Sequence, residues 1–210
     1  MKTKMRLPTG HSKSSRQRMD LQKDGVYQLK VVLALSRPSI WRRVLVPGNY
    51  TLAILHDVVQ CLMGWEDCHL HEFVVGNARY GPAARRDDLF APDIEDEKRA
   101  ILKEIMTGAR KSFKYIYDFG DDWIHEIKLE KILLPEAGKT YPLCVGGENA
   151  CPPEDIGGIF GYYEQLEILK DRAHPEHKEV KEWMGRFDPA SFSIEAVNQS
   201  LRAFFRKPAR

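Results

Sequence analysis

Three histidines and two aspartates have side chains from which a metal site could be built. His69 and His71 stand two residues apart in CHLHEF, so on a strand both side chains would point to one side. A third imidazole, from His125 on a neighbouring strand, would complete a facial ligand set for Zn²⁺, Fe²⁺ or Mn²⁺. Asp118 or Asp121 could add a carboxylate. The sequence thus predicts a candidate divalent-metal site.

His125 also has a second interpretation, as a structural histidine of the core. In FKYIYDFGDDWIHEIKLEK, residues 113–131, His125 occupies an alternate position between Trp123 and Ile127. On a strand, that position belongs to the buried face. Burial would favour the neutral ring, held by a hydrogen bond to Tyr117 or to the backbone. Both interpretations remain open at this point.

A Pro- and Gly-rich stretch, residues 135–160, is predicted to be an ordered loop. Its exposed Glu154 and Asp155 could join Asp118 and Asp121 in a site of several carboxylates, as in metal-dependent nucleases. The other residues assigned a structural role in this loop are Cys144, Cys151, Pro152, Pro153, Gly157 and Gly158. The seven-residue offsets between Cys61 and Cys68 and between Cys144 and Cys151 are too long for a zinc knuckle, so small core cysteines are expected.

Basic residues point to a different function, contact with nucleic acid or protein. Residues 1–24 hold seven Lys or Arg and two Asp, and they are predicted to form a flexible basic arm. Positive charge places a protein on phosphate, and an aromatic ring can stack on bases. The candidate contacts are Arg16, Arg18, Arg37, Trp41, Arg42 and Arg43.

The composition is that of a soluble protein: 43% of the residues are hydrophobic, 30% are charged, and the net charge is +2. No apolar run approaches the roughly 20 residues that a membrane-spanning helix needs. Four cysteines without a secretion signal indicate reduced thiols. We therefore expect a cytoplasmic protein without a membrane partner.

The elements that would position these side chains follow from the hydrophobic pattern. Strands are predicted over 27–35, 40–47 and 69–76 and in a hairpin over 113–131, and helices over 52–64, 98–106, 162–171, 175–185 and 194–205. Strands early and helices late favour an α+β fold, an antiparallel or mixed sheet with packed helices and a helical C-terminal region. Residues 25–210 are expected to form a single domain.

The apolar pattern of the predicted hairpin also predicts the length of its loop. Its two halves put their apolar residues on one face only if the loop has an odd number of residues. A three-residue loop, Gly120-Asp121-Asp122, meets this condition and sets Tyr117 opposite His125. Asp122 would then adopt the left-handed conformation.

Four motifs together resemble one known family. RPSIWRRVLVP, LHDVVQCLMGWEDCHLHEF, YIYDFGDDWIHEIKLEK and CPPEDIGGIFGYYE occur in the order found in the plasmid pRiA4b ORF-3-like family, and the resemblance spans roughly residues 26–205. It implies a compact α+β fold in bacterial and archaeal proteins that are often encoded on plasmids or near mobile elements. It implies no substrate, cofactor or catalytic residue.

Some members of that family carry a transposon-resolvase label, which the residues do not support. Ser12, Ser14 and Ser15 all precede the first predicted strand, and no histidine is followed by Arg in an H-x-x-R element. The favoured function is a binding module of plasmid or mobile-element biology, contacting nucleic acid or a mobile-element protein. The alternative is a metal-dependent hydrolase that uses the His/Asp cluster.

Overall fold

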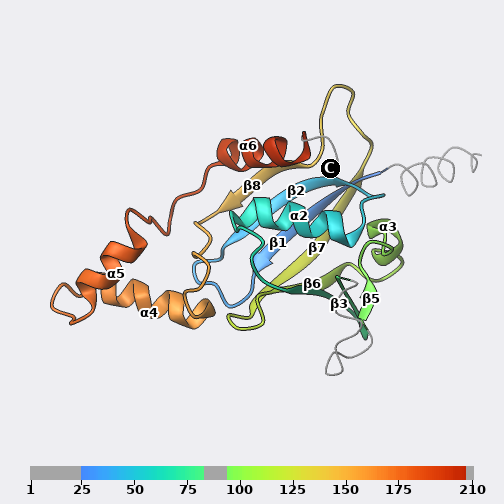
Figure 1. Ribbon diagram of the computed structural model, residues 1–210. Helices are drawn as coiled ribbons and strands as arrows, with labels where there is room; N and C mark the ends of the chain where they lie inside the picture. The colour runs from blue at the N-terminus through green and yellow to red at the C-terminus, as the bar shows by residue number, and fades with distance from the viewer. Residues whose placement is uncertain (1–24, 83–93, 207–210) are drawn as a thin grey trace, which may run out of the picture.

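The computed structural model describes residues 25–82 and 94–206, which contain one eight-stranded sheet (Figure 1). The strand order is β5-β4-β3-β6-β7-β1-β2-β8. All neighbouring strands are antiparallel except β4 and β5, which are parallel. The strands are β1 (Val26–Leu33), β2 (Trp41–Pro47), β3 (His71–Val75), β4 (Ala78–Gly81), β5 (Ile94–Asp96), β6 (Ser112–Tyr117), β7 (Trp123–Leu133) and β8 (Leu143–Glu148).

Five helices accompany the sheet in the described ranges, and the combination confirms the predicted α+β class. They are α2 (Leu52–Met63), α3 (Leu102–Ile105), α4 (Gly158–Lys170), α5 (His177–Met184) and α6 (Ile194–Phe205). Thr51 caps α2 by accepting a hydrogen bond from the Ile54 N–H, and Gly64 ends it in the left-handed conformation. None of the described helices has the length and apolar character needed to cross a bilayer.

The core lies between α2 and one face of the sheet, across which α2 runs in Figure 1. Alternate residues of β1, β6 and β7 point into it, among them Leu29, Val31, Tyr115 and Ile127. The intervening residues of these strands lie on the opposite face and are half-buried or exposed. The sheet therefore has one covered face and one open face.

The pairing of the β6–β7 hairpin is shifted by two residues from the prediction, so Tyr117 does not lie opposite His125. Tyr115 lies opposite His125, and Tyr117 opposite Trp123. The loop has five residues, 118–122, because Asp118 itself adopts a left-handed conformation and its carbonyl accepts the Asp122 N–H at 2.7 Å. Five is also odd, so the shared apolar face is confirmed. The predicted left-handed Asp122 is confirmed too, with φ of 52°.

The C-terminal helices occupy two places. α4 and α5 lie together beyond one end of the sheet, whereas α6 lies beside β8 (Figure 1). β8 falls in the stretch predicted to be a loop, since two glycines weaken its strand pattern. The side chain of Asn198 from α6 bonds both backbone groups of Cys144, at 2.8 and 2.9 Å, and so anchors α6 to this edge strand.

Candidate metal centre

Three segments far apart in the sequence meet at the tip of the β6–β7 hairpin and bring His69 between two carboxylates. The Nε2 atom of His69 lies 3.2 Å from an oxygen of Asp155 and 3.7 Å from an oxygen of Asp118. This nitrogen is shielded from solvent, yet neither contact has the geometry of a hydrogen bond. The three ligand atoms form one of the candidate ion-binding groups in the described residues.

The spacing of these atoms fits a shared metal ion. Donor atoms about 2.1 Å from a metal are separated by roughly 3.0 Å when they subtend 90° and by about 3.4 Å at the tetrahedral angle. The separations of 3.2 and 3.7 Å from His69 are close to these values. Because Nε2 has no hydrogen-bond partner, the two nearby oxygens leave it available as a ligand for an ion.

Asp118 is held so that one oxygen faces the centre. Its Oδ1 accepts the N–H of Gly120 at 2.9 Å, while its own N–H donates to the carbonyl of Leu70. These bonds stabilise the left-handed backbone, with φ of 58°. The remaining oxygen, Oδ2, is the one directed at His69.

Tyr117, next to Asp118 in the chain, positions the other two segments. Its hydroxyl oxygen accepts the N–H groups of Cys68 and His69 and donates its proton to Glu154 at 2.5 Å. The second oxygen of Glu154 accepts the N–H of Glu66. Burial and then this bond to Glu154 raise the pKa of Tyr117, which keeps the hydroxyl protonated as a donor.

The loop that carries Asp155 is packed directly on the hairpin tip. The N–H of Gly157 donates to the carboxylate of Asp121, and Trp65 donates to the carbonyl of Pro152 at 3.0 Å. Gly158 has φ of 68°, and a Cβ there would lie 2.3 Å from the Asp121 carbonyl oxygen. Only glycine permits this approach, so the Gly157-Gly158 pair sets the position of the loop.

Negative charge dominates this region. Asp118, Asp121, Glu154 and Asp155 converge within it, and no Lys or Arg of the described ranges forms an ion pair with any of them. Within 4 Å of Asp118 and Asp155, the ion-pairing group among the described residues is the imidazole of His69, which is uncharged unless protonated. Such a cluster attracts cations.

The other two predicted histidine ligands lie elsewhere, so the structure does not bring the three imidazoles together. β3 begins only at His71, which leaves His69 outside the strand, and the Nε2 of His71 instead bonds Glu97 at 2.8 Å. His125 is fully buried beside Tyr115 and Trp65. It belongs to neither group of candidate ligands found in the described residues.

His125 is a core histidine without its expected partner. The Tyr117 hydroxyl is directed to Glu154, and neither ring nitrogen of His125 makes a hydrogen bond. Burial lowers the pKa of His125 to about 4, although the nearby backbone of Trp123 and Tyr115 offsets part of that effect. The ring is therefore neutral at physiological pH.

A second histidine group, which the residue pattern did not predict, lies between α2 and the sheet. His56 stacks on His71 with ring centroids 3.5 Å apart and planes 9° from parallel, and it bonds Tyr115 and Asp67. Ring lone pairs lie in the ring plane, so two parallel stacked rings cannot both direct a nitrogen at one ion. Burial and then the charge of His71 lower the pKa of His56 to about 4. The missed signal is spacing: His56 shares the apolar helix face with Leu52.

The predicted basic contacts are only partly available. Arg42, a candidate contact, is buried, and its guanidinium donates to the carbonyls of Leu62, Trp41 and Glu148, so it does not reach the surface. Arg43 makes a bidentate pair with Glu130. The half-buried Trp41 and Arg43 lie on the open face of the sheet, and Arg37 is exposed at the β1–β2 turn. Arg16 and Arg18 lie outside the described residues.

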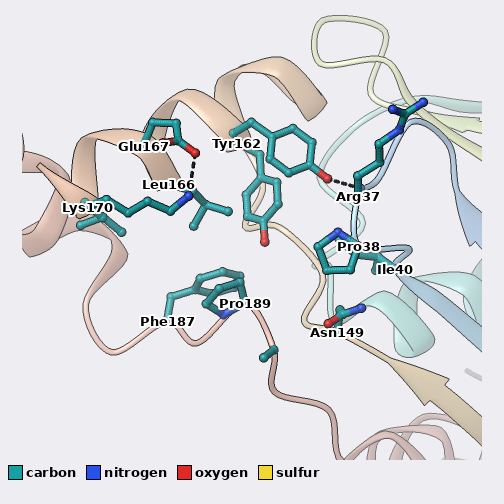
Figure 2. Close-up of a pocket in the computed structure, with 13 residues that line it drawn as sticks. Arg37, Pro38, Ile40, Asn149, Tyr162, Leu166, Glu167, Lys170, Phe187 and Pro189 are labelled. Carbon is teal, nitrogen blue, oxygen red and sulfur yellow. Dashed lines mark hydrogen bonds and ion pairs between the residues drawn. The ribbon is translucent and has the colours of Figure 1, made fainter.

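A separate groove lies between α4, the segment after α5 and the β1–β2 turn. Figure 2 shows Leu166, Phe187, Pro189 and Pro38 around it. Its volume is about 440 Å³, and it contains none of the residues of the candidate metal centre. Tyr163 closes one side by accepting a hydrogen bond from the backbone N–H of Arg37.

Comparison with known proteins identifies the family. The model of the plasmid pRiA4b ORF-3-like protein family matches residues 25–196. The chain belongs to that family. The uncharacterised protein y4hQ of Sinorhizobium fredii (strain NBRC 101917 / NGR234) is 38% identical over 188 residues, which cover 88% of this chain and 95% of that protein.

A solved structure of another similar protein supports the fold. The crystal structure of the protein of unknown function MM3350 from Methanosarcina mazei Go1 is 41% identical, with a TM-score of 0.74, and the match covers 82% of this chain and 97% of that one. The predicted family and fold are thus confirmed. Neither relative is described with a function.

Proposed function

We propose that this protein binds a divalent metal ion through His69, Asp118 and Asp155. The observation that carries the proposal is the shielded Nε2 of His69, which faces two carboxylate oxygens without forming a hydrogen bond to either. Tyr117 and Glu154 act as outer-shell groups that orient the ligand-bearing segments. No part of the proposal needs His71 or His125.

The donor set indicates the class of metal. One imidazole and two carboxylates suit first-row ions such as Mn²⁺, Fe²⁺ and Zn²⁺, whereas Mg²⁺ prefers oxygen ligands and retains its waters. Three protein ligands leave coordination positions open. The side chain of Asp155 is 75% exposed and that of Asp118 only 12%, so the open positions face solvent on the Asp155 side.

Calorimetric titration of untagged, EDTA-treated protein with Mn²⁺ and with Zn²⁺ tests the proposal. We expect one ion per chain, and at least about 10-fold weaker binding in Asp118→Asn, Asp155→Asn and His69→Gln. Asn tolerates the left-handed backbone of both aspartates, so these two variants should keep the fold. Glu164→Gln, which removes an exposed charge from α4, is the matched control.

Two results would count against the metal site. One is the absence of saturable binding of either ion by the wild-type protein. The other is binding that the three ligand variants retain at the level of Glu164→Gln. The short distances would then reflect packing of His69 against the two carboxylates without an ion.

We propose hydrolysis at a bound ion as a second candidate function, because the exposed Asp155 would leave such an ion open to solvent. A metal ion generates a nucleophilic hydroxide near neutral pH by lowering the pKa of bound water. Bis(p-nitrophenyl) phosphate with Mn²⁺-loaded protein tests this directly. A rate equal to that of free Mn²⁺, or one that Asp155→Asn leaves unchanged, would reject hydrolysis of this phosphodiester and leave metal binding intact.

A further inference from the structure

A row of three basic residues crosses the open face of the sheet. Lys128 of β7 lies opposite Lys30 of β1, and Lys30 lies opposite Arg43 of β2. Neighbouring strands are about 4.8 Å apart, so three positive side chains stand side by side. Like charges directly opposite one another destabilise a sheet. The next row shows the usual arrangement, with Lys114 opposite Glu126.

Only part of this charge is neutralised within the protein. Glu130 accepts two hydrogen bonds from Arg43, at 2.6 and 2.9 Å, and a third from Gln28. These bonds lower the pKa of Glu130 to about 2, so it is ionised and matches the charge of Arg43. Among the described residues, neither Lys30 nor Lys128 has an ion-pair partner within 4 Å. The row thus holds two ammonium groups without a direct carboxylate partner among the described residues, although Glu130 also attracts Lys30 at longer range.

An aromatic ring lies beside the row on the same face. The centroid of Trp41 is 4.7 Å from the Lys30 ammonium nitrogen and 5.0 Å from the Arg43 guanidinium carbon. Its indole N–H donates to Glu148 at 3.0 Å, which holds the ring in one orientation. The position opposite Arg43 is Gly146, which adds no side chain to the face.

We infer that this open face binds single-stranded nucleic acid, with Lys30 and Lys128 on phosphates and a base stacked on Trp41. Charge complementarity selects the occupant, because a phosphate chain supplies the missing negative charge. The Trp41 ring favours a nucleic acid over other polyanions. Each base has a π-face that can stack on the indole, whereas a carboxylated or sulfated polysaccharide has none. A sheet face with basic side chains and a stacking ring is a common platform for single strands. The inference uses different residues from the metal centre and does not rest on it.

Fluorescence anisotropy with labelled U₁₂ and dT₁₂ tests the inference on the full chain. We expect Trp41→Ala to weaken binding roughly 5- to 100-fold, and Trp41→Tyr to retain most of the affinity. For Lys30→Gln/Lys128→Gln, the slope of log affinity against log salt should fall by about 1.4, which is 0.7 for each lost phosphate contact.

Matched controls are available on α5. Trp183→Ala removes an aromatic ring that is 52% exposed, and Lys181→Gln removes an exposed charge. Both should bind like the wild type. Thermal unfolding of every variant separates lost contacts from lost folding, and Trp41→Tyr provides a conservative check if Trp41→Ala unfolds.

Three results would overturn the inference. The first is a wild-type chain that binds neither oligonucleotide, and the second is a double lysine variant whose salt slope equals that of Lys181→Gln. The third is equal affinity of Trp41→Ala and Trp183→Ala. In that case heparin should compete equally for both variants, and the face would be a general anion-binding surface without base stacking.

Discussion

Replacement of His125 by phenylalanine should make the protein more resistant to acid. His125 is completely buried, both of its ring nitrogens lack hydrogen-bond partners, and it packs against Tyr115 and Trp65. An aromatic ring of similar shape can take its place without a polar group. Leaving a buried polar atom unpaired costs about 1–3 kcal/mol, so the variant should be at least as stable as the wild type at pH 7.5.

The acid effect follows from the pKa of His125, about 4 in the folded protein against 6.5 for the free side chain. Between these values the unfolded chain binds a proton that the folded chain refuses, so stability falls as the pH drops. For one histidine, the loss between pH 7.5 and pH 5 is about 2 kcal/mol. His125→Phe should lack this contribution.

Urea unfolding at pH 7.5, 6 and 5, followed by far-UV circular dichroism, measures the difference. His56 also has a lowered pKa and will contribute in both proteins, so the comparison between them isolates His125. Equal losses in wild type and His125→Phe would refute the reasoning. A large destabilisation of the variant at pH 7.5 would show that His125 makes hydrogen bonds after all.

Three further variants test the packing around the candidate sites. Gly158→Ala should lower the free energy of unfolding by about 2–5 kcal/mol, through backbone strain and a clash with the hairpin. Gly64→Ala is the control: its added Cβ meets no atom within 4 Å, so only the backbone strain of about 1–2 kcal/mol should remain. Tyr117→Phe should weaken Mn²⁺ binding about 10- to 100-fold in calorimetry without removing a ligand, and an unchanged affinity would contradict its positioning role. Asn198→Ala should cost about 2–4 kcal/mol in urea unfolding, because it leaves two backbone groups of β8 unpaired; the exposed Gln199→Ala on the same helix should be neutral.

The hairpin shows what the sequence can predict about the fold. Alternation along a strand decides the face, so the apolar face was predictable from residue types. The pairing of Tyr115 with His125 was not, because it depends on where β6 ends. That point is set by Asp118, whose left-handed backbone and side-chain bond to Gly120 begin the loop two residues early. A single aspartate gives no signal strong enough to predict this.

The candidate metal centre was predictable in part, for a similar reason. The suggestion that Asp155 could join Asp118 rested on residue type, and the structure places both beside His69. The expected inclusion of His71 failed because β3 begins two residues after His69. Contacts between segments about 50 and 86 positions from His69 depend on glycines that permit close approach, and spacing alone cannot reveal them.

Burial of Arg42 shows the limit of reasoning from charge. Arg42 alternates in β2 with the same spacing as Val44 and Val46, which places its side chain on the core side of the strand. Its charge, in contrast, suggested a contact at the surface. Three backbone carbonyls, from Leu62, Trp41 and Glu148, accept hydrogen bonds from Arg42 and offset the free-energy cost of burying its charge. Backbone acceptors of this kind have no signature in residue types.

The close contact between Gly158 and the hairpin tip has a consequence for communication across the molecule. Gly158 is the first residue of α4, Asp155 precedes it by three residues, and Leu166 of the same helix lines the groove in Figure 2. α4 thus connects the proposed ion ligand Asp155 to the groove. If a groove ligand displaces α4, linkage requires that ligand and the proposed metal ion to change each other's affinity by the same factor.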